Sequence, residues 1–469
     1  MSDDDLRKSA RMLYDEAPCF IELPAGHGKT ELVAAAAQVA QDRRQRLLIL
    51  THTHAGVNAI RRRLRTFGVS KGVQVTTLDS WTKSLVEAFP VLAGYLVVDE
   101  VDWVAVRARG LALLANVHIQ AMIIASYDRV IVDEYQDCNL TQHKLVMAVN
   151  ALVPVIILGD PLQAIYGFSG NELIEWETDL ATIPLVQVPI FPWRWHNNNE
   201  QLGEFLTEVR SRLINGQPIE FSGSPVCWYE DTQQNRIAIC KSTLNSPGDV
   251  VALLHMPHEM PLLAKQLGGA FGFMEELEGK LLIGLAKVVD EGSVGVATAT
   301  SVLRFVRDCF SKLPASLTAK YQSMAAGTYP PFQPNSKLGP LLSRLHAFTL
   351  DPTSAKDLEE TLVIAETLGG KLIRREAWYE MKRATKRWRE GSSPDLVSAV
   401  RAVRDQSRIL GRRHERRVVS RVVLVKGQQF ENCIVIGADT LSACELYVAL
   451  TRPTHRLIVL SSSMTLNPN

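Results

Sequence analysis

The sequence predicts an α/β protein built on parallel sheets, and two observations carry this prediction. Runs of β-branched and aliphatic residues at Arg129–Val132 and at 155–158 each end in acidic and polar groups. Buried parallel strands present reactive side chains at their carboxyl ends in this way. A glycine-containing loop at 23–30 also lies between a predicted strand, Cys19–Glu22, and an alanine-rich predicted helix at 31–41. The order strand, loop, helix is typical of the same fold class.

The length and charge of the chain limit how many domains it can form and how it can bind nucleic acid. At 469 residues the chain exceeds one ordinary domain, and we expect roughly two to four domains. Its 51 basic and 50 acidic residues give a formal charge of +1. Because there is no overall cationic field, any binding to nucleic acid has to depend on local patches.

The cysteines and the N-terminus predict a soluble, cytoplasmic protein. The seven cysteines are scattered without a C-x-x-C pair, which argues against structural zinc or an iron–sulfur cluster and favours reduced thiols. The N-terminal stretch MSDDDLRKSA is acidic and polar, unlike a signal peptide. No apolar run approaches the ~18 residues of a membrane span.

The loop at 23–30 reads LPAGHGKT and predicts a nucleotide phosphate site. Its backbone N–H groups and the dipole of the following helix would face a phosphate, its lysine would reach the β- and γ-phosphates, and its threonine hydroxyl would bind Mg²⁺. Leu23 stands where the usual pattern has its first glycine. The competing interpretation is a glycine turn that merely precedes a helix. The candidate ligands of ATP and Mg²⁺ are Gly26, His27, Gly28, Lys29 and Thr30.

An acidic pair, Asp133 and Glu134, directly follows the predicted strand Arg129–Val132. One carboxylate can hold Mg²⁺ or its waters while the next polarises an attacking water, so we assign Asp133 to the metal and Glu134 to the general base. A second acidic pair at 99–100 also follows an apolar run. Only the first pair continues into Gln-Asp and is followed at strand spacing by Gly-Asp, so we expect the pair at 99–100 to lie on the surface of a small insert.

Two further strands, predicted at 46–50 and 72–76, end in hydroxyl-bearing residues. The helix between them carries four arginines, which form either a solvated face or a contact with nucleic-acid phosphates. The hydroxyl groups can likewise bind backbone phosphates or cap the helices that follow. They belong to Thr51, Thr53, Thr77 and Ser80.

Taken in order, the motifs GHGKT, THTHAGVNAI, TLDSW, VIVDEYQDCN and ILGDPLQAIYGF resemble those of the UvrD/Rep/PcrA branch of superfamily-one DNA helicases. The second half of the chain adds PWRW, VKGQQF and YVALTR, and the last matches the family's final motif almost letter for letter. The segments between the motifs match poorly. The resemblance implies two RecA-like parallel-sheet domains with ATP between them and single-stranded DNA across the top, each interrupted by a mainly helical insert.

Carried over to this chain, the resemblance divides it into four parts, and both inserts are shorter than in the processive family members. The first RecA-like domain would comprise 1–80 and 126–192 around a small insert at 81–125, and the second would comprise 193–270 and 418–469 around an insert at 271–417.

The resemblance also implies roles for individual residues. Gln163 would sense the γ-phosphate and couple it to DNA. Arg194 and Arg452 would be arginine fingers supplied by the second domain, with an interdomain salt bridge as the alternative. Gln429 stands at the ribose-binding position, where the family has glutamate.

Two aromatic residues, Tyr166 and Phe168, match positions at which the family stacks DNA bases. Stacking on aromatic rings tolerates any base sequence, as a translocating enzyme requires. Core packing behind the sheet is the alternative for Tyr166.

Several positions depart from the family pattern, and most of them concern DNA rather than ATP. Asp79 and Val423 replace histidines, Ser169 replaces an arginine, and the adenine-reading glutamine upstream of the phosphate loop is missing. The residues for ATP hydrolysis are therefore complete, strict preference for ATP is in question, and the expected DNA contacts are eroded.

The segment 371–417 is the most basic part of the chain. It holds 15 basic and 6 acidic residues, a local excess of 15 − 6 = +9, with Trp378, Tyr379 and Trp388 interleaved. Such a face can grip nucleic acid or dock on an acidic partner, and a solvated pair of arginine-rich helices is the bland alternative.

We therefore predict a DNA-dependent ATPase of the UvrD-like type that moves 3′-to-5′ on DNA or unwinds it, with single-stranded DNA or single-stranded ends as its partner. The alternative is a DNA-sensing ATPase subunit that regulates a partner nuclease in bacterial antiphage defence, similar to the helicase-like subunit of Gabija-type systems. An inactive scaffold is a third interpretation, which the intact Lys29, Glu134 and Arg452 argue against.

Overall fold

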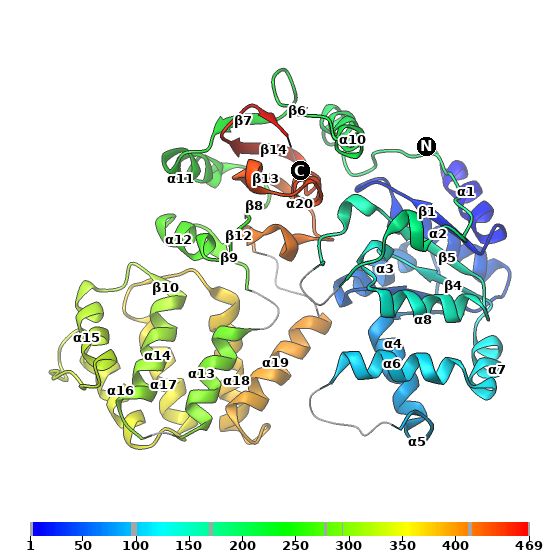
Figure 1. Ribbon diagram of the computed structural model, residues 1–469. Helices are drawn as coiled ribbons and strands as arrows, with labels where there is room; N and C mark the ends of the chain where they lie inside the picture. Colours follow the sequence, from blue (N-terminus) through cyan, green and yellow to red (C-terminus); the bar gives the residue numbers. More distant parts are fainter. Residues whose placement is uncertain are drawn as a thin grey trace.

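The computed structural model describes residues 3–94, 101–167, 172–275, 279–292, 294–410 and 415–467. It contains two parallel sheets, each covered by helices, and a large helical insert (Figure 1). The predicted α/β class, with two parallel-sheet domains and mainly helical inserts, is confirmed. The exact boundaries of the four parts stay a prediction. The acidic pair at 99–100 and Phe168 lie outside the described residues.

The first sheet has the strand order β1-β5-β4-β2-β3, and all neighbouring strands are parallel. The phosphate-loop strand β1 is thus separated from the acidic strand β4 by β5. Because the strands are parallel, all five carboxyl ends meet at one edge. The strands are β1 (Cys19–Glu22), β2 (Leu47–Thr51), β3 (Val73–Thr77), β4 (Arg129–Val132) and β5 (Val155–Gly159).

Alternation along these strands builds a core on each face of the sheet. Leu47 and Ile49 of β2 pack with one set of helices, and the intervening Leu48 and Leu50 pack with the other. This period of two is the geometry of a strand buried on both faces. One face is covered by α1 (Asp3–Asp15), α2 (Lys29–Asp42) and α3 (His54–Thr66), and the other by α4 (Leu78–Ala88), α6 (Trp103–Leu114), α7 (Val117–Ser126) and α8 (Leu140–Asn150).

Two of the predicted boundaries shift for local reasons. Strand β2 begins at Leu47 rather than Arg46, because the Arg46 backbone N–H donates to the Asp128 carboxylate at 2.7 Å instead of to a neighbouring strand. Helix α2 begins at Lys29, two residues before the predicted start, because Gly28 is its N-cap. Short elements complete this part of the chain: α5 (Pro90–Ala93), α9 (Trp176–Asp179) and the 3₁₀ turns η1 (Tyr135–Asp137) and η2 (Pro161–Gln163).

The second sheet has the order β7-β14-β13-β8-β12-β9 and is also parallel. Its strands bury both faces, against α10 and α20 on one side and α11 and α12 on the other. The elements are β7 (Cys227–Glu230), β8 (Val250–Leu254), β9 (Gly272–Phe273), β12 (Arg417–Arg421), β13 (Phe430–Ile436), β14 (Pro453–Ser461), α10 (Glu200–Ile214), α11 (Gln233–Ser242), α12 (Glu259–Gln266), α20 (Ala443–Leu450), the turns η3 (Thr243–Asn245), η4 (Val422–Val425) and η5 (Ala438–Thr440), and the separate pair β6 (Ile219–Glu220) and β15 (Thr465–Leu466).

The large insert between β9 and β12 is helical and has a core of its own, centred on Trp378 and Phe305. The segment between α15 and α16 is a loop that contains several proline and glycine residues. The insert contains α13 (Lys280–Asp290), α14 (Val296–Cys309), α15 (Ala315–Ala325), α16 (Gly339–Leu350), α17 (Ala355–Glu366), α18 (Arg375–Arg389), α19 (Leu396–Leu410) and the short pair β10 (Phe310–Ser311) and β11 (Lys371–Leu372).

Two global expectations bear on the setting of the protein. All seven cysteines are free thiols. Among the described residues no single helix has the length and apolar character needed to cross a membrane, and α6 with α7 meets those criteria only as a pair bent by 90°.

Candidate active site at the junction of the two sheets

The phosphate loop connects β1 to α2 and leaves the start of that helix open to an anion. Gly26 and Gly28 have φ values of 76° and 88°, a left-handed conformation that favours glycine. Gly28 caps α2 without a side-chain hydrogen bond, so the first N–H groups of the helix have no side chain to satisfy them. Together with the helix dipole, this geometry suits a phosphate group.

A segment of the second half of the chain packs directly on this loop. An added Cβ at Gly28 would lie 2.7 Å from Trp193 Cδ1, and one at Gly26 would lie 2.8 Å from Trp195 Cζ3. The Arg194 backbone N–H donates to the Gly26 carbonyl at 3.0 Å. Both glycines are therefore required by space as well as by conformation.

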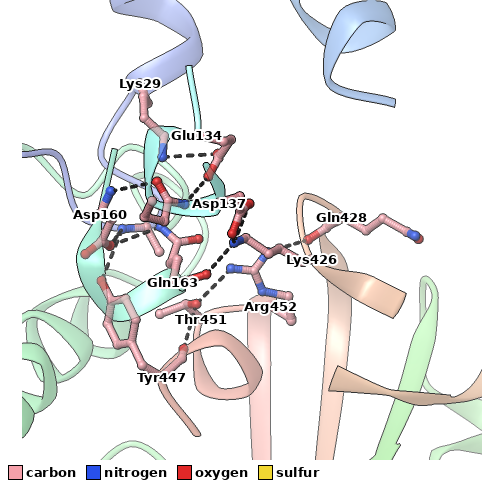
Figure 2. A network of polar contacts seen from close by, with 12 residues as sticks. Lys29, Glu134, Asp137, Asp160, Gln163, Lys426, Gln428, Tyr447, Thr451 and Arg452 are labelled. Carbon is pink, nitrogen blue, oxygen red and sulfur yellow. Dashed lines mark hydrogen bonds and ion pairs between the residues drawn. The ribbon is translucent and has the colours of Figure 1, made fainter. Parts of the chain in front are cut away.

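Lys29 and Glu134 form an ion pair across the sheet edge, with 3.1 Å between Nζ and Oε1 (Figure 2). The second oxygen of Glu134 accepts from Gln136 Nε2 at 2.6 Å. Glu134 itself has φ 57°, a left-handed backbone for a non-glycine residue. Such a conformation is typically held in place only where the surrounding structure fixes it, often at functional sites.

The two carboxyl groups of the acidic pair, Asp133 and Glu134, have very different pKa values. Burial raises the pKa of Asp133 to about 7, and the neighbouring charge of Glu134 adds to the effect. Burial would also raise the pKa of Glu134, but the Lys29 and Lys426 ammonium groups outweigh it and hold that pKa at about 2. Glu134 is therefore the carboxylate of this pair that remains ionised at neutral pH.

The residues present fit a magnesium ion bound together with a nucleotide. Among the described residues Asp133 Oδ1 is buried without a hydrogen-bond partner, and Thr30 lies in the first turn of α2. No group of three or more His, Cys, Asp or Glu side chains suited to a metal occurs in the described part of the chain. Mg²⁺ commonly takes one or two protein oxygens and completes its shell with phosphates and water. Bound there, it would neutralise phosphate charge, with Thr30 and Asp133 as its protein contacts.

Asp160, at the end of β5, ties the phosphate loop to both halves of the molecule. Its carboxylate accepts from the Ala25 backbone N–H at 3.1 Å and from Gln163 Nε2 at 3.0 Å. Tyr447 Oη, from α20, lies 3.1 Å from the same Ala25 nitrogen. Arg210 of α10 donates to Asp160 at 3.2 Å and also to the Glu22 carboxylate. The predicted Gln163 thus lies in a network at the loop, as Figure 2 shows for its central members.

The two predicted arginine fingers occupy different positions. Arg194 lies over the phosphate loop, donates to the Thr451 carbonyl and stacks on Trp195. Burial and the nearby Arg452 lower the pKa of Arg194 to about 9. Arg452 is 1% exposed and donates within its own half, to the Val448 carbonyl at 2.7 Å and the Thr451 hydroxyl at 2.9 Å. Neither arginine makes a carboxylate ion pair with the described residues, so the salt-bridge alternative finds no support there.

The hydroxyl groups predicted to meet DNA lie along the same edge of the first sheet. Thr51 and Thr77 are register partners at the ends of β2 and β3. Thr53 caps α3 by accepting from the Gly56 N–H at 3.0 Å, and Thr77 caps α4 by accepting from the Ser80 N–H at 3.1 Å. Thr53 and Thr77 therefore serve as helix caps here, and a role of the four hydroxyl groups at phosphates stays a prediction.

One of the remaining predicted residues, Tyr166, is partly buried against the opposite half. Tyr166 lies with its ring centroid 4.9 Å from the Lys426 ammonium, and its hydroxyl reaches the Val423 carbonyl at 3.5 Å. Gln429 is exposed. Lys426, Tyr447 and Arg210 are contacts that sequence reasoning did not single out. The first two lie inside quoted motifs, whereas Arg210 lies on an amphipathic helix without a motif.

A small cavity opens beside the phosphate loop, next to α1. Its polar groups are few: the Ser9 hydroxyl, and the His27 imidazole, whose Nδ1 lies 2.8 Å from the Ala25 carbonyl and whose Nε2 lies 3.5 Å from Thr207 Oγ1. Its lining consists of Leu6, Ser9, Leu23, His27, Gly28, Leu32, Val188 and Pro189.

Some cations of the basic segment 371–417 are paired with acidic groups outside or inside it. Lys382 pairs with Glu366 and Arg389 with Glu359, both acidic groups belonging to α17. Trp378 is fully buried in the insert core, so it is wrong to count this ring among surface aromatics. At least seven of the fifteen cations are ion-paired: Arg374, Arg375, Lys382, Arg383, Lys386, Arg389 and Arg404.

Comparison with known proteins agrees with the first part of this description. A family model described as an AAA domain matches residues 7–169, which contain the whole first sheet. No curated protein matches the chain. A solved structure, the crystal structure of Pif1 helicase from Candida albicans, is similar at 13% identity over 52% of this chain and 55% of that one, with a TM-score of 0.27. The chain thus spans about half the length of that structure, and a similarity of this size assigns no function.

Proposed function

We propose that the protein is a DNA-dependent ATPase of the UvrD-like type, which couples ATP hydrolysis to 3′-to-5′ movement on DNA or to its unwinding. The observation that carries this proposal is the pairing of Lys29 with an ionised Glu134, beside a buried Asp133 with one unpartnered oxygen. Phosphate binding, water activation and metal binding are the three functions that hydrolysis requires.

The start of α2 and the segment after β4 supply these functions. The α2 N-terminus and Lys29 hold phosphate, and Thr30 with Asp133 would hold Mg²⁺. Glu134, with its pKa kept low, accepts a proton from the attacking water. Arg194 lies over the phosphate loop and can stabilise the charge that develops on the transferred group. The AAA-domain similarity over residues 7–169 supports nucleotide use in this half.

Dependence on DNA and the direction of movement rest on the motif resemblance, supported by where Tyr166 lies. Its ring sits beside Lys426 at the junction, and η2 between β5 and Tyr166 carries Gln163. A base stacked near Tyr166 would therefore be one short segment away from the Asp160 network.

Strand displacement tests this proposal. A duplex with a 3′ single-stranded tail should be separated in the presence of ATP and Mg²⁺, while a duplex with a 5′ tail should not. Glu134→Gln protein provides the control for passive melting. Equal displacement from both tails would contradict the assigned direction.

The second candidate function, a DNA-sensing ATPase subunit of a nuclease system, is favoured by one contact. Asp79 replaces a histidine of the family pattern, and both of its oxygens accept from Arg107 of the small insert, at 2.7 and 2.6 Å. Gln142 also donates to it at 3.0 Å. A carboxylate held in this way is not a phosphate contact, which fits weakened coupling to DNA movement.

A comparison of ATP hydrolysis with strand displacement distinguishes the two candidate functions. A sensing subunit would hydrolyse ATP in response to DNA without displacing a strand from either tailed duplex. It would also co-purify from its own cells with a nuclease, and addition of DNA or ATP would change the activity of that nuclease. Strand displacement by the purified protein alone favours the first candidate.

A further inference from the structure

Lys426 belongs to the second sheet's half of the chain, yet its ammonium is bound by the first half. It lies 2.5 and 2.7 Å from the two oxygens of Asp137 and also donates to the Gln163 carbonyl. The Tyr166 ring covers it at 4.9 Å from the ring centroid. A lysine has three N–H donors, and these contacts use them (Figure 2).

The contacts of Lys426 continue to the phosphate site as an unbroken series. The Gln163 side chain donates to Asp160, whose backbone N–H donates to Gln136 Oε1 at 3.1 Å. Gln136 in turn donates to Glu134, the ion-pair partner of Lys29. A residue beside the predicted base-stacking ring is thereby joined to the predicted phosphate-binding lysine through side chains at the ends of β4 and β5.

Burial makes the Asp137–Lys426 pair dependent on closure of the two halves. The two side chains are 3% and 5% exposed. A charge left buried without its partner is strongly unfavourable, so the pair either forms completely or both groups return to water. An element with two such discrete arrangements can carry coupling between two sites.

We propose that Lys426 is a positioning residue that couples the two halves of the ATPase, joining Asp137, Gln163 and Tyr166 only in the closed arrangement and so linking DNA at Tyr166 to hydrolysis at Glu134. The part of this inference that concerns DNA at Tyr166 rests on the proposed function. The part that concerns closure of the two halves depends only on the geometry of the Asp137–Lys426 pair.

The first test compares ATPase activity of the full chain with and without oligo-deoxythymidine. The variants are Lys426→Met, Asp137→Asn and the double variant, with Lys426→Arg to restore the charge. Lys83→Met is the matched control, since Lys83 is also a partly buried, ion-paired lysine but lies on α4. Thermal unfolding of each variant checks that it folds.

We expect Lys426→Met to reduce the DNA-stimulated kcat at least tenfold, with a smaller effect on the KM for ATP. Asp137→Asn should do the same, and the double variant should lose no more than either single one, because the pair acts as a unit. Lys426→Arg should recover part of the stimulation and the control should keep all of it. Wild-type stimulation in Lys426→Met, or equal loss of basal and stimulated rates with additive single effects, would overturn the proposal.

The second test reads closure directly and is decisive even where wild-type protein shows no DNA stimulation. Fluorophores are placed at exposed Thr66 and Asn215, one in each half, and energy transfer is measured with and without a non-hydrolysable ATP analogue. Lys426→Met and Asp137→Asn should lower the closed fraction relative to wild type and to Lys83→Met. An unchanged closed fraction in these variants contradicts the inference. If the closed fraction falls but the ATPase activity of the wild type does not respond to DNA, only the dependence on DNA in the proposed function has failed.

Discussion

The Lys29 ammonium lies 3.1 Å from the Glu134 carboxylate, so the residue predicted to bind phosphate is ion-paired with the residue predicted to activate water. A phosphate bound at Lys29 would compete with this carboxylate for the three N–H donors of the ammonium. Phosphate binding would therefore weaken the contact that Lys29 makes with Glu134.

Replacing Glu134 with glutamine should abolish turnover while preserving nucleotide binding. Loss of a general base lowers turnover by about 10²–10⁴-fold. The neutral amide also competes less for Lys29, so ATP should bind at least as tightly as to wild type. Equilibrium binding of a fluorescent ATP analogue and steady-state hydrolysis measure the two effects, and normal turnover would show that the base is misassigned.

Replacing Arg194 with alanine should reduce kcat by about 10³-fold or more, because arginine fingers contribute on that scale. Arg194 is the better placed of the two candidate fingers, since its backbone N–H donates to the Gly26 carbonyl of the phosphate loop and its guanidinium donates to the Thr451 carbonyl. Arg452 is held by Val448 and Thr451, so Arg452→Ala should lower thermal stability as well as activity. A kcat unchanged in Arg194→Ala would remove it from the catalytic set.

Two of the four arginines of α3 have side-chain partners within the first half of the chain. Arg61 donates to the Val75 carbonyl and Arg63 pairs with Glu31. Arg62 and Arg65 are exposed, as is Arg61. If α3 borders the DNA track, Arg62→Glu and Arg65→Glu should each weaken single-stranded DNA binding and lower its salt slope by about 1. Arg63→Glu is the contrasting variant and should reduce thermal stability. If Arg62→Glu and Arg65→Glu both bind single-stranded DNA with the affinity and the salt slope of wild type, DNA lies elsewhere.

Discrimination between nucleotide bases should be weak. The glutamine that reads adenine in the resembled family is missing upstream of the phosphate loop, and both nitrogens of the nearby His27 already lie near protein oxygens. Strong discrimination needs polar groups that the wrong base would leave unpaired, whereas apolar contacts discriminate only about 10–200-fold. The ratio of kcat/KM for ATP over GTP should therefore stay below about 200. A ratio above about 10⁴ would show that a polar group of the protein reads the base.

The sequence predicts those parts of the fold that depend on residues close together along the chain. β4 has the predicted bounds because Arg129–Val132 is a buried apolar run that ends in an acidic pair, and the loop at Gly26 and Gly28 follows from its glycines. The contacts of the junction were not predictable in the same way. Arg210 reaches Asp160 across 50 residues of sequence and Lys426 reaches Asp137 across 289, and no local pattern encodes such distances.

The basic segment 371–417 shows what a count of charges along the sequence leaves out. Its excess of cations is real in the sequence, but Glu359 and Glu366 of α17 lie outside the counted window and pair with Arg389 and Lys382. Charge balance is set by neighbours in space, which a sequence window does not contain. Trp378, counted as a surface aromatic, packs instead at 5.7 Å from Phe305 in the insert core.

The most direct measurement of the central claim is steady-state ATP hydrolysis by the purified full chain, with and without single-stranded DNA, beside the Glu134→Gln protein. The arrangement of Lys29, Asp133 and Glu134 predicts Mg²⁺-dependent hydrolysis that single-stranded DNA stimulates and that the glutamine variant lacks. Hydrolysis no faster than that of Glu134→Gln, in the presence of DNA as well as in its absence, would contradict it.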